Sequence, residues 1–222
     1  MNPLYAALIP PQGRCIDIGA SLGSKTAAML DAGAGFVLAV EPMPETAEAL
    51  RRYFSYERRV QVLQVAIGPR RGTAELHVCS ASPTLCTLSR HFRQSSRFAR
   101  HQYVWDRTIR VQQVNISQLL GSGLWDFVKV DVEGYEYEIL SGLRRNVGCL
   151  CFEYHEEFLD RAELCLAKLY RVGFRQFAFT RAEQQRLASD WQNAGDTYKC
   201  LRRRQPAADE SWGYWGDVYA RP

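Results

Sequence analysis

Two short acidic patterns hold the groups of this chain that are best suited to chemistry. Asp131-Val132-Glu133-Gly134 follows the run Phe127-Val128-Lys129-Val130, and Glu153-Tyr154-His155 ends a second apolar run. Residues two apart in an extended segment face the same way, so each pattern can direct two polar groups into one cleft. There they could deprotonate a hydroxyl, hold a divalent ion or orient the amine of a cofactor. The candidate catalytic residues are therefore Asp131, Glu133 and His155.

Each of these residues also has a simpler interpretation. Glu133 could only place negative charge at the N-terminus of a helix that begins near Tyr135, and His155 could be an ordinary loop histidine. Asp131 follows its strand directly, at the edge where α/β sheets bind ligands. The pattern therefore favours Asp131 most strongly.

The first expected strand leads into a turn with the composition of a cofactor site. In Asp17-Ile18-Gly19-Ala20-Ser21-Leu22-Gly23, Gly19 permits a sharp turn close to a ligand, and Gly23 permits close packing of the next helix. Asp17 would repel a pyrophosphate at about 4 Å by roughly 4 kcal/mol at an effective dielectric constant of about 20. It suits a cofactor that brings an ammonium group and hydroxyls. The turn thus indicates S-adenosylmethionine.

Two phosphate-binding motifs compete at the same place, and both are incomplete. The run Gly19-Ala20-Ser21-Leu22-Gly23-Ser24-Lys25-Thr26 has Ser24 where a Walker A motif needs its second glycine. The glycine spacing is G-x-x-x-G, whereas a dinucleotide site has G-x-G-x-x-G. A tight turn without any ligand is the remaining alternative.

Glu41 is placed to bind a ribose. It follows the continuous apolar run Phe36–Val40 and lies about twenty residues after the glycine turn, where an acidic residue can accept both ribose hydroxyls. A solvated loop glutamate is the alternative, but Pro42 restricts the backbone here. We therefore expect Glu41 to bind the ribose of the cofactor.

The positions of these residues require an alternating α/β architecture. Strands are expected near 14–18, 36–40, 60–66, 73–79, 127–132, 149–154, 175–180 and 217–220, and helices near 25–31, 44–54, 135–142 and 162–172. Such alternation predicts a doubly wound, mostly parallel sheet with right-handed crossovers. Ligands of such sheets bind outside the carboxyl ends of the strands, where the acidic patterns lie.

Length and composition are consistent with one catalytic domain over 1–222, with an N-terminal extension over 1–13 and an insertion over 69–112 that forms a hairpin and helical structure. The chain has 222 residues, of which 46% are hydrophobic and 23% charged, which is ordinary for a globular protein. The segment from Met1 to Pro11 does not resemble a signal peptide, and no apolar run is long enough to span a membrane. The expected location is cytoplasmic. The seven cysteines include no C-x-x-C pair, so we expect reduced core residues.

The segment from Thr87 to Arg110 is basic and aromatic. It holds six arginines and two histidines against the single acid Asp106. Arginines among aromatic residues could bind a phosphorylated, glycosylated or nucleic-acid substrate, or they could be the solvated face of an amphipathic helix. Because the segment lies between the third and fourth core strands, we expect it to cover the acceptor site.

The motifs together resemble those of FkbM-family methyltransferases. The resemblance rests on Asp17-Ile18-Gly19-Ala20, Val40-Glu41-Pro42, Ala66-Ile67-Gly68 and, most specifically, the run from Asp126 to Glu136 followed by Leu140-Ser141-Gly142. It implies the class I methyltransferase fold, with an antiparallel last strand near Trp215 to Ala220, and S-adenosylmethionine as cofactor. It also implies cofactor contacts and a reactive centre near Asp131 and Glu133. The implied cofactor-binding residues are Asp17, Gly19, Ala20, Ser21, Gly23 and Glu41, with Ala66 and Ile67 near the adenine.

Some positions depart from the family pattern. Ser21 and Met43 stand where the family often has asparagine, and Asn115-Ile116-Ser117 replaces the usual Thr-Leu-Asp. The resemblance implies O-methylation of a hydroxyl on a small-molecule or glycan acceptor, with a divalent metal as an open option. The alternatives are a methyltransferase-like binding module without turnover and a nucleic-acid methyltransferase. The latter has support only from the arginine-rich segment and lacks an aromatic proline motif.

Overall fold

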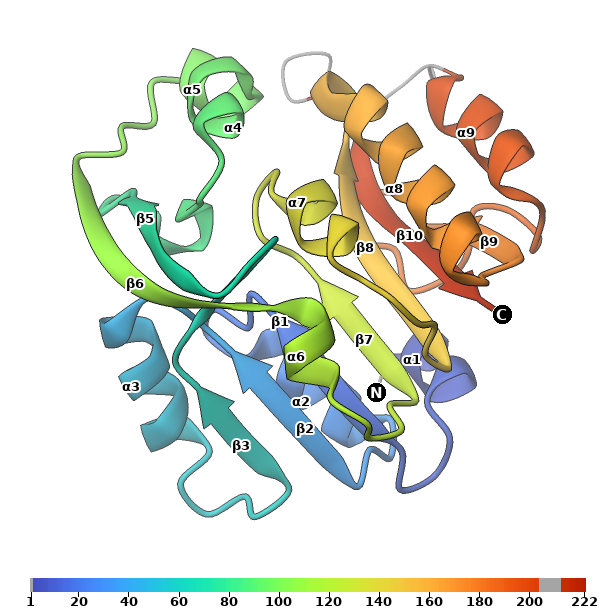
Figure 1. Cartoon of the computed structure of the whole chain (residues 1–222), viewed down its shortest axis with the longest axis horizontal. Coiled ribbons are helices and arrows are strands. Elements are labelled where there is room, and N and C mark those ends of the chain that lie inside the picture. The colour runs from blue at the N-terminus through green and yellow to red at the C-terminus, as the bar shows by residue number, and fades with distance from the viewer. Residues whose placement is uncertain (1, 204–212) are drawn as a thin grey trace.

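The structure is a computed structural model that describes residues 2–203 and 213–222. A seven-stranded sheet forms the centre of the molecule (Figure 1). Its strand order is β3-β2-β1-β7-β8-β10-β9. The first five strands pair in parallel, and β10 is antiparallel to both of its neighbours. The strands are β1 (Arg14–Ile18), β2 (Phe36–Val40), β3 (Val60–Leu63), β7 (Phe127–Val130), β8 (Cys149–His155), β9 (Gln176–Phe179) and β10 (Trp215–Arg221). The predicted fold class is confirmed.

Helices cover both faces of this sheet. One face carries α1 (Pro3–Leu8), α2 (Ser24–Asp31) and α3 (Pro44–Tyr53), and the other carries α6 (Ile116–Leu120), α7 (Glu136–Ser141), α8 (Leu159–Val172) and α9 (Ala194–Arg202). Two large buried clusters fill the spaces between sheet and helices. Within β1, Cys15 belongs to the cluster of α1 and α2, and Ile16 belongs to the opposite cluster. Successive side chains of a strand point to opposite faces of the sheet, so each central strand is buried on both faces.

A smaller sheet lies beside the carboxyl edge, with the order β4-β6-β5. It comprises β4 (Ala66–Gly68), β5 (Gly72–Val78) and β6 (Arg107–Asn115). The single strand expected over 60–66 is therefore two strands, because β4 leaves the main sheet to pair with β6. The antiparallel pair of β5 and β6 is the expected hairpin, but the bounds of β6 were not predicted, since its arginines and glutamines resemble a solvated surface in the sequence.

Between β5 and β6 the chain forms η1 (Pro83–Leu85) and two short helices, α4 (Arg90–Ser95) and α5 (Arg97–Arg100). Figure 1 shows this segment above the carboxyl ends of the strands, away from the helices on the sheet faces. Its aromatic residues pack inward in one cluster around the fully buried Phe92. The segment is therefore attached to the fold by a small core of its own.

All seven cysteines have free thiols, and five of them are buried. Burial raises the pKa of Cys149 to about 12, so this thiol stays protonated and unreactive at neutral pH. The expectation of reduced core cysteines is confirmed. Within residues 2–203 and 213–222, no helix has the length and apolarity needed to cross a membrane.

Candidate active site

Two cavities meet at the carboxyl edge of the central sheet. The smaller is lined by Glu41, Ala66 and Ile67 among others and encloses about 540 Å³ of space, open solvent included. The larger extends toward α2 and β10 and encloses about 2230 Å³, open solvent included. Both cavities are lined by Gly19, Ser21, Thr84, Asp131 and Glu133. A molecule in one cavity can therefore reach a molecule in the other across this shared wall.

The turn after β1 passes directly beside the end of β7. The backbone N–H groups of Gly19 and Ala20 donate hydrogen bonds to the carbonyl oxygen of Val40, at 2.9 and 3.0 Å. The N–H of Asp131 donates to the carbonyl of Ile18 at 2.9 Å. Gly19 has a φ of 84°, and a methyl group there would overlap the Asp131 carbonyl oxygen. The close approach that the sequence predicted for Gly19 is thus made to the chain itself.

Glu41 points into the smaller cavity. Its carboxylate accepts hydrogen bonds from the N–H groups of Ser21 and Met43, at 3.0 and 2.9 Å. Only 6% of the residue is exposed, and burial raises the pKa of Glu41 to about 7. Carboxylate lone pairs beyond these two bonds remain available, so Glu41 can accept ribose hydroxyls as the sequence predicted.

Asp17 and Gly23 lie outside the linings of both cavities. Asp17 is fully buried and accepts a hydrogen bond from the Thr26 hydroxyl at 2.7 Å, which ties β1 to α2. A Cβ on Gly23 would meet the side chains of Leu50 on α3 and of Phe54 just after it, so Gly23 permits close packing against α3 and not, as predicted, of its own helix against the strand. Ala20 lines the larger cavity. The structure thus gives Asp17 and Gly23 a supporting position, and their contact with cofactor stays a prediction.

Asp131 is held by a buried lysine. The ammonium of Lys129 lies 3.1 Å from the Asp131 carboxylate and 2.9 Å from that of Asp217 on β10. Lys129 is 1% exposed, so these two carboxylates replace its water shell. Burial acts to raise the pKa of Asp131, but Lys129 outweighs it and lowers this pKa below its usual value. Asp131 is therefore an ionised group on the wall shared by the cavities.

Glu133 has the opposite electrostatic environment. Burial and the neighbouring carboxylates of Glu153 and Asp131 raise the pKa of Glu133 well above its usual value. Its backbone adopts a φ of 57°, in the left-handed region that non-glycine residues seldom occupy. The turn is held by Glu136, whose carboxylate accepts hydrogen bonds from the N–H groups of Val132 and Gly134. The fold thus maintains an unfavourable backbone conformation that directs Glu133 toward both cavities.

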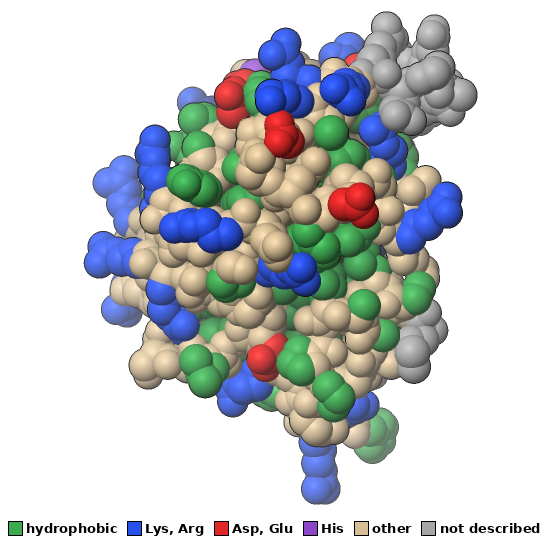
Figure 2. Space-filling view, turned by 90° about the vertical axis from the view of Figure 1, so that its right-hand side faces the viewer, with side chains coloured by type: hydrophobic (Ala, Val, Ile, Leu, Met, Phe, Trp, Pro, Cys, Tyr) green, Lys and Arg blue, Asp and Glu red, His purple; other side chains and the backbone are tan. Residues whose placement is uncertain are grey.

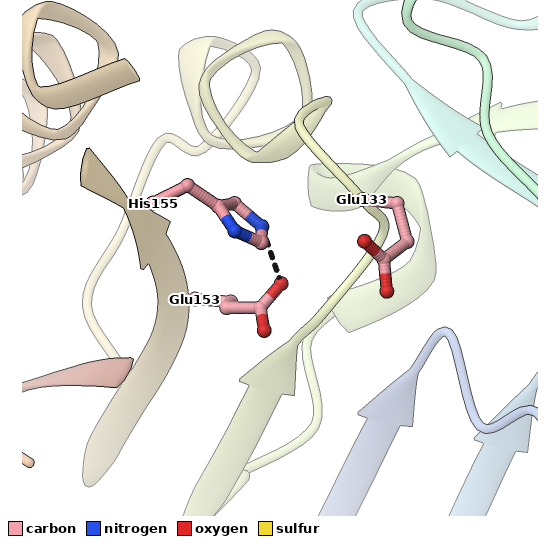
Figure 3. A group of neighbouring side chains, drawn as sticks. All are labelled: Glu133, Glu153 and His155. Atoms are coloured by element: carbon pink, nitrogen blue, oxygen red, sulfur yellow. Dashed lines mark ion pairs between the residues drawn. The ribbon is translucent and has the colours of Figure 1, made fainter. Parts of the chain in front are cut away.

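The two acidic patterns lie side by side, because β7 and β8 are paired neighbours. Figure 3 shows Glu133, in the loop after β7, facing Glu153 and His155 at the end of the neighbouring strand β8. The His155 Nε2 atom lies 2.8 Å from Glu153 Oε2. Glu133, Glu153 and His155 each offer one potential metal-ligand atom, and these atoms lie within 4.8 Å of one another. Glu153 lines the larger cavity, whereas His155 lies behind it and lines neither of the two cavities.

Comparison with known proteins identifies the family. A family model described as the methyltransferase FkbM domain matches residues 17–184. The chain belongs to the FkbM methyltransferase family. It is accordingly an S-adenosylmethionine-dependent methyltransferase, and the predicted cofactor is confirmed. No curated protein matches the chain in sequence.

Solved structures share the fold of this FkbM methyltransferase. The precorrin-6y C5,15-methyltransferase of Geobacter metallireducens GS-15 is 11% identical, with a TM-score of 0.50, over 100% of this chain and 88% of that one. A putative RNA methyltransferase of Pyrococcus horikoshii is 10% identical, also with a TM-score of 0.50, over 99% of this chain and 79% of that one. At these identities the likeness shows the fold alone.

Three polar residues of this methyltransferase site were missing from the candidates chosen by sequence. Lys129 carried a signal, since a charged residue inside a buried apolar strand requires a partner. Glu153 belonged to a recognised pattern, but His155 was selected in its place, and the structure puts Glu153 at the cavity. Asp217 has no local signal, because its role depends on an ion pair with a residue 88 positions away.

Proposed function

We propose that this FkbM methyltransferase transfers a methyl group to a hydroxyl of a small-molecule or glycan acceptor. The observation that supports this most is the wall shared by the two cavities, which presents Asp131 and Glu133 to both. The cofactor would occupy the smaller cavity, with its ribose on Glu41 and its adenine near Ala66 and Ile67. The acceptor would approach the methyl group from the larger cavity.

The two carboxylates of the shared wall suit different tasks. Methyl transfer is an in-line displacement, so most of the work is alignment of the two reactants. A hydroxyl also needs a base, and a base works best when its pKa lies near the operating pH. The raised pKa of Glu133 makes it the stronger base, whereas Asp131 is kept ionised by Lys129. We assign proton removal to Glu133 and orientation of the reactants to Asp131.

The larger cavity combines aromatic and polar side chains, as a site for a hydroxylated ring would. Its lining includes Tyr5, Lys25, Phe98, Tyr103, Trp215 and Asp217. Aromatic faces can pack on a ring, and the charged groups can bind its hydroxyls. Phe98 and Tyr103 come from the segment over 87–110, which supports the proposal that this segment covers the acceptor and excludes water.

Two of the six arginines of this segment are engaged within the protein and are less available to a nucleic acid. Arg97 is buried, and Arg107 pairs with Glu45 at 2.8 Å. On the face of the molecule with α8 and α9, Figure 2 shows lysines and arginines spread over the surface among acidic and hydrophobic side chains. Phosphate binding would give an affinity that falls steeply with salt, by a log–log slope of roughly 0.7 to 0.9 per contact. We expect weak nucleic-acid binding at physiological salt.

The test is a methyl-transfer screen over hydroxylated acceptors, including sugars. We expect turnover of at least one such acceptor, with Asp131→Asn and Glu133→Gln each lowering turnover by about two orders of magnitude. Asp160→Asn, at an exposed position on α8, is the matched control. Cofactor binding without turnover of any acceptor would support the binding-module alternative instead. Full activity in both site variants would overturn the assigned roles.

A further inference from the structure

Arg97 lies in the segment over 87–110 and reaches the group formed by Glu133, Glu153 and His155, called the acidic group below. It begins α5, yet only 3% of the residue is exposed. Its guanidinium binds Glu157 in a bidentate pair, with Nε at 3.1 Å and Nη2 at 2.7 Å from the carboxylate oxygens. The Arg97 backbone N–H donates to the same carboxylate at 2.6 Å. Arg97 is therefore held rigidly in the interior and is not an arginine available to a ligand.

The same guanidinium contacts His155. Arg97 Nη2 lies 3.2 Å from His155 Nδ1. A guanidinium has donors and no acceptor, so a hydrogen bond here uses the lone pair of Nδ1, and Nη2 shares its second N–H between Nδ1 and the Tyr214 carbonyl at 3.3 Å. A neutral imidazole then carries its proton on the other nitrogen, Nε2. Nε2 lies 2.8 Å from Glu153 Oε2, so a proton on Nε2 makes this close contact with the carboxylate attractive, although the ring N–H is not aligned with the oxygen.

This protonation state distinguishes two uses of the acidic group. Glu133 Oε2, Glu153 Oε2 and His155 Nε2 are buried and make no aligned hydrogen bond with any described residue, which by itself would suit a divalent cation. A cation needs the lone pair of Nε2, however, which would move the proton to Nδ1 and turn it toward Arg97. The contact from Arg97 therefore favours a proton on Nε2 over a cation.

We infer that Arg97 is a positioning residue: it fixes His155 as the Nε2–H tautomer, so that His155 holds the Glu153 carboxylate at the acceptor cavity. Glu153 in turn lines that cavity, where it would contact the acceptor. Phe92 and Phe158 pack against the imidazole, with ring centroids 5.4 and 6.2 Å from it, and keep water from competing. The inference rests on the proposed function only for the role of Glu153, not for the tautomer.

The tautomer can be measured without an acceptor. The chain has four histidines, so nitrogen-15 spectra of histidine-labelled protein are simple enough to assign with a His155→Gln variant. We expect the Nε2–H tautomer for His155 in the wild type and its loss in Arg97→Gln. Arg100→Gln is the matched control, since Arg100 also contacts Glu157, at 3.5 Å, but is 65% exposed. If Arg97→Gln does not fold, Arg97→Lys replaces it.

Each outcome decides the inference. A His155 proton on Nδ1 in the wild type would overturn it, as would selective loss of the His155 signals on addition of stoichiometric Mn²⁺. With an acceptor in hand, Arg97→Gln should lower kcat/KM for the acceptor by up to about 100-fold while leaving the affinity for S-adenosylhomocysteine unchanged. An equal loss of cofactor affinity would indicate a general structural role and overturn the positioning role. Failure of the acceptor screen alone leaves the tautomer result valid, so the two proposals fail separately.

Discussion

Gly19 and Asp131 lie in backbone contact, although they belong to different strand ends: the space where Gly19 would carry a Cβ is occupied by the carbonyl oxygen of Asp131. β1 and β7 are parallel neighbours, so the glycine turn after β1 and the end of β7 that carries Asp131 form one surface. Any side chain at position 19 would separate them. The contact explains why one turn can serve both cavities.

Gly19→Ala should therefore destabilise the protein and abolish cofactor binding. The left-handed conformation alone costs an alanine roughly 1–2 kcal/mol, and displacement of the Asp131 backbone adds to this. Gly33→Ala is the matched control, because Gly33 also has a positive φ, of 102°, but has open space around it. We would measure urea unfolding and calorimetric titration with S-adenosylhomocysteine. Equal effects of the two substitutions would show that the contact with Asp131 is unimportant.

Glu41→Ala should weaken binding of S-adenosylhomocysteine by about 1 to 3 kcal/mol, or about 5- to 150-fold in Kd, because hydrogen bonds to a charged acceptor are lost. Glu48→Ala, on the exposed side of the following helix, should leave the affinity unchanged. Calorimetric titration of both variants compares them directly. An unchanged Kd in Glu41→Ala would remove the ribose-binding role.

Cofactor affinity should also depend on pH near neutrality. Burial raises the pKa of Glu41 to about 7, so the carboxyl is protonated in the free protein below that pH. The ionised form is the better acceptor for hydroxyls, so affinity should rise as pH increases through about 7 and fall below it, by up to about tenfold per pH unit. Titrations from about pH 6 to pH 8 test this. The same dependence in Glu41→Gln would assign the effect to another group.

Lys129→Met should be strongly destabilising. It leaves the carboxylates of Asp131 and Asp217 buried without their cation, a change that costs about 3–5 kcal/mol when a buried pair is broken. The double variant Lys129→Met, Asp217→Asn should recover part of this loss, since one uncompensated charge is removed. Urea unfolding measures both. A loss below about 1 kcal/mol in the single variant would show that water or rearrangement compensates the charges.

Much of this protein could be predicted from local sequence. The apolar runs predicted β1 and β2 with their observed bounds, because strands buried on both faces need continuous apolar residues. The glycine turn and Glu41 predicted the cofactor, since a parallel sheet brings these positions to one edge. The sequence also predicted that Asp131 and Glu133 lie at the carboxyl edge, because they come one and three residues after the apolar strand β7.

Other features arise only when distant segments meet. β6 owes its existence to pairing with β4 and β5, and its sequence alone has no strand signal strong enough to be recognised. α6 is short and begins with a capping box at Asn115, a position that the sequence marked only as a departure from the family pattern.

The polar residues of the candidate site also divide into those predicted from local sequence and those placed by contacts between distant segments. The sequence determined which side chains stand at the strand ends, because a period of two and the ends of apolar runs are local properties. Only the tertiary structure decided that Lys129 pairs with Asp217, that Glu153 and not His155 lines the cavity, and that Arg97 contacts His155. These contacts join residues between 58 and 88 positions apart, and a buried charge takes whichever opposite charge or lone pair the packing brings to it.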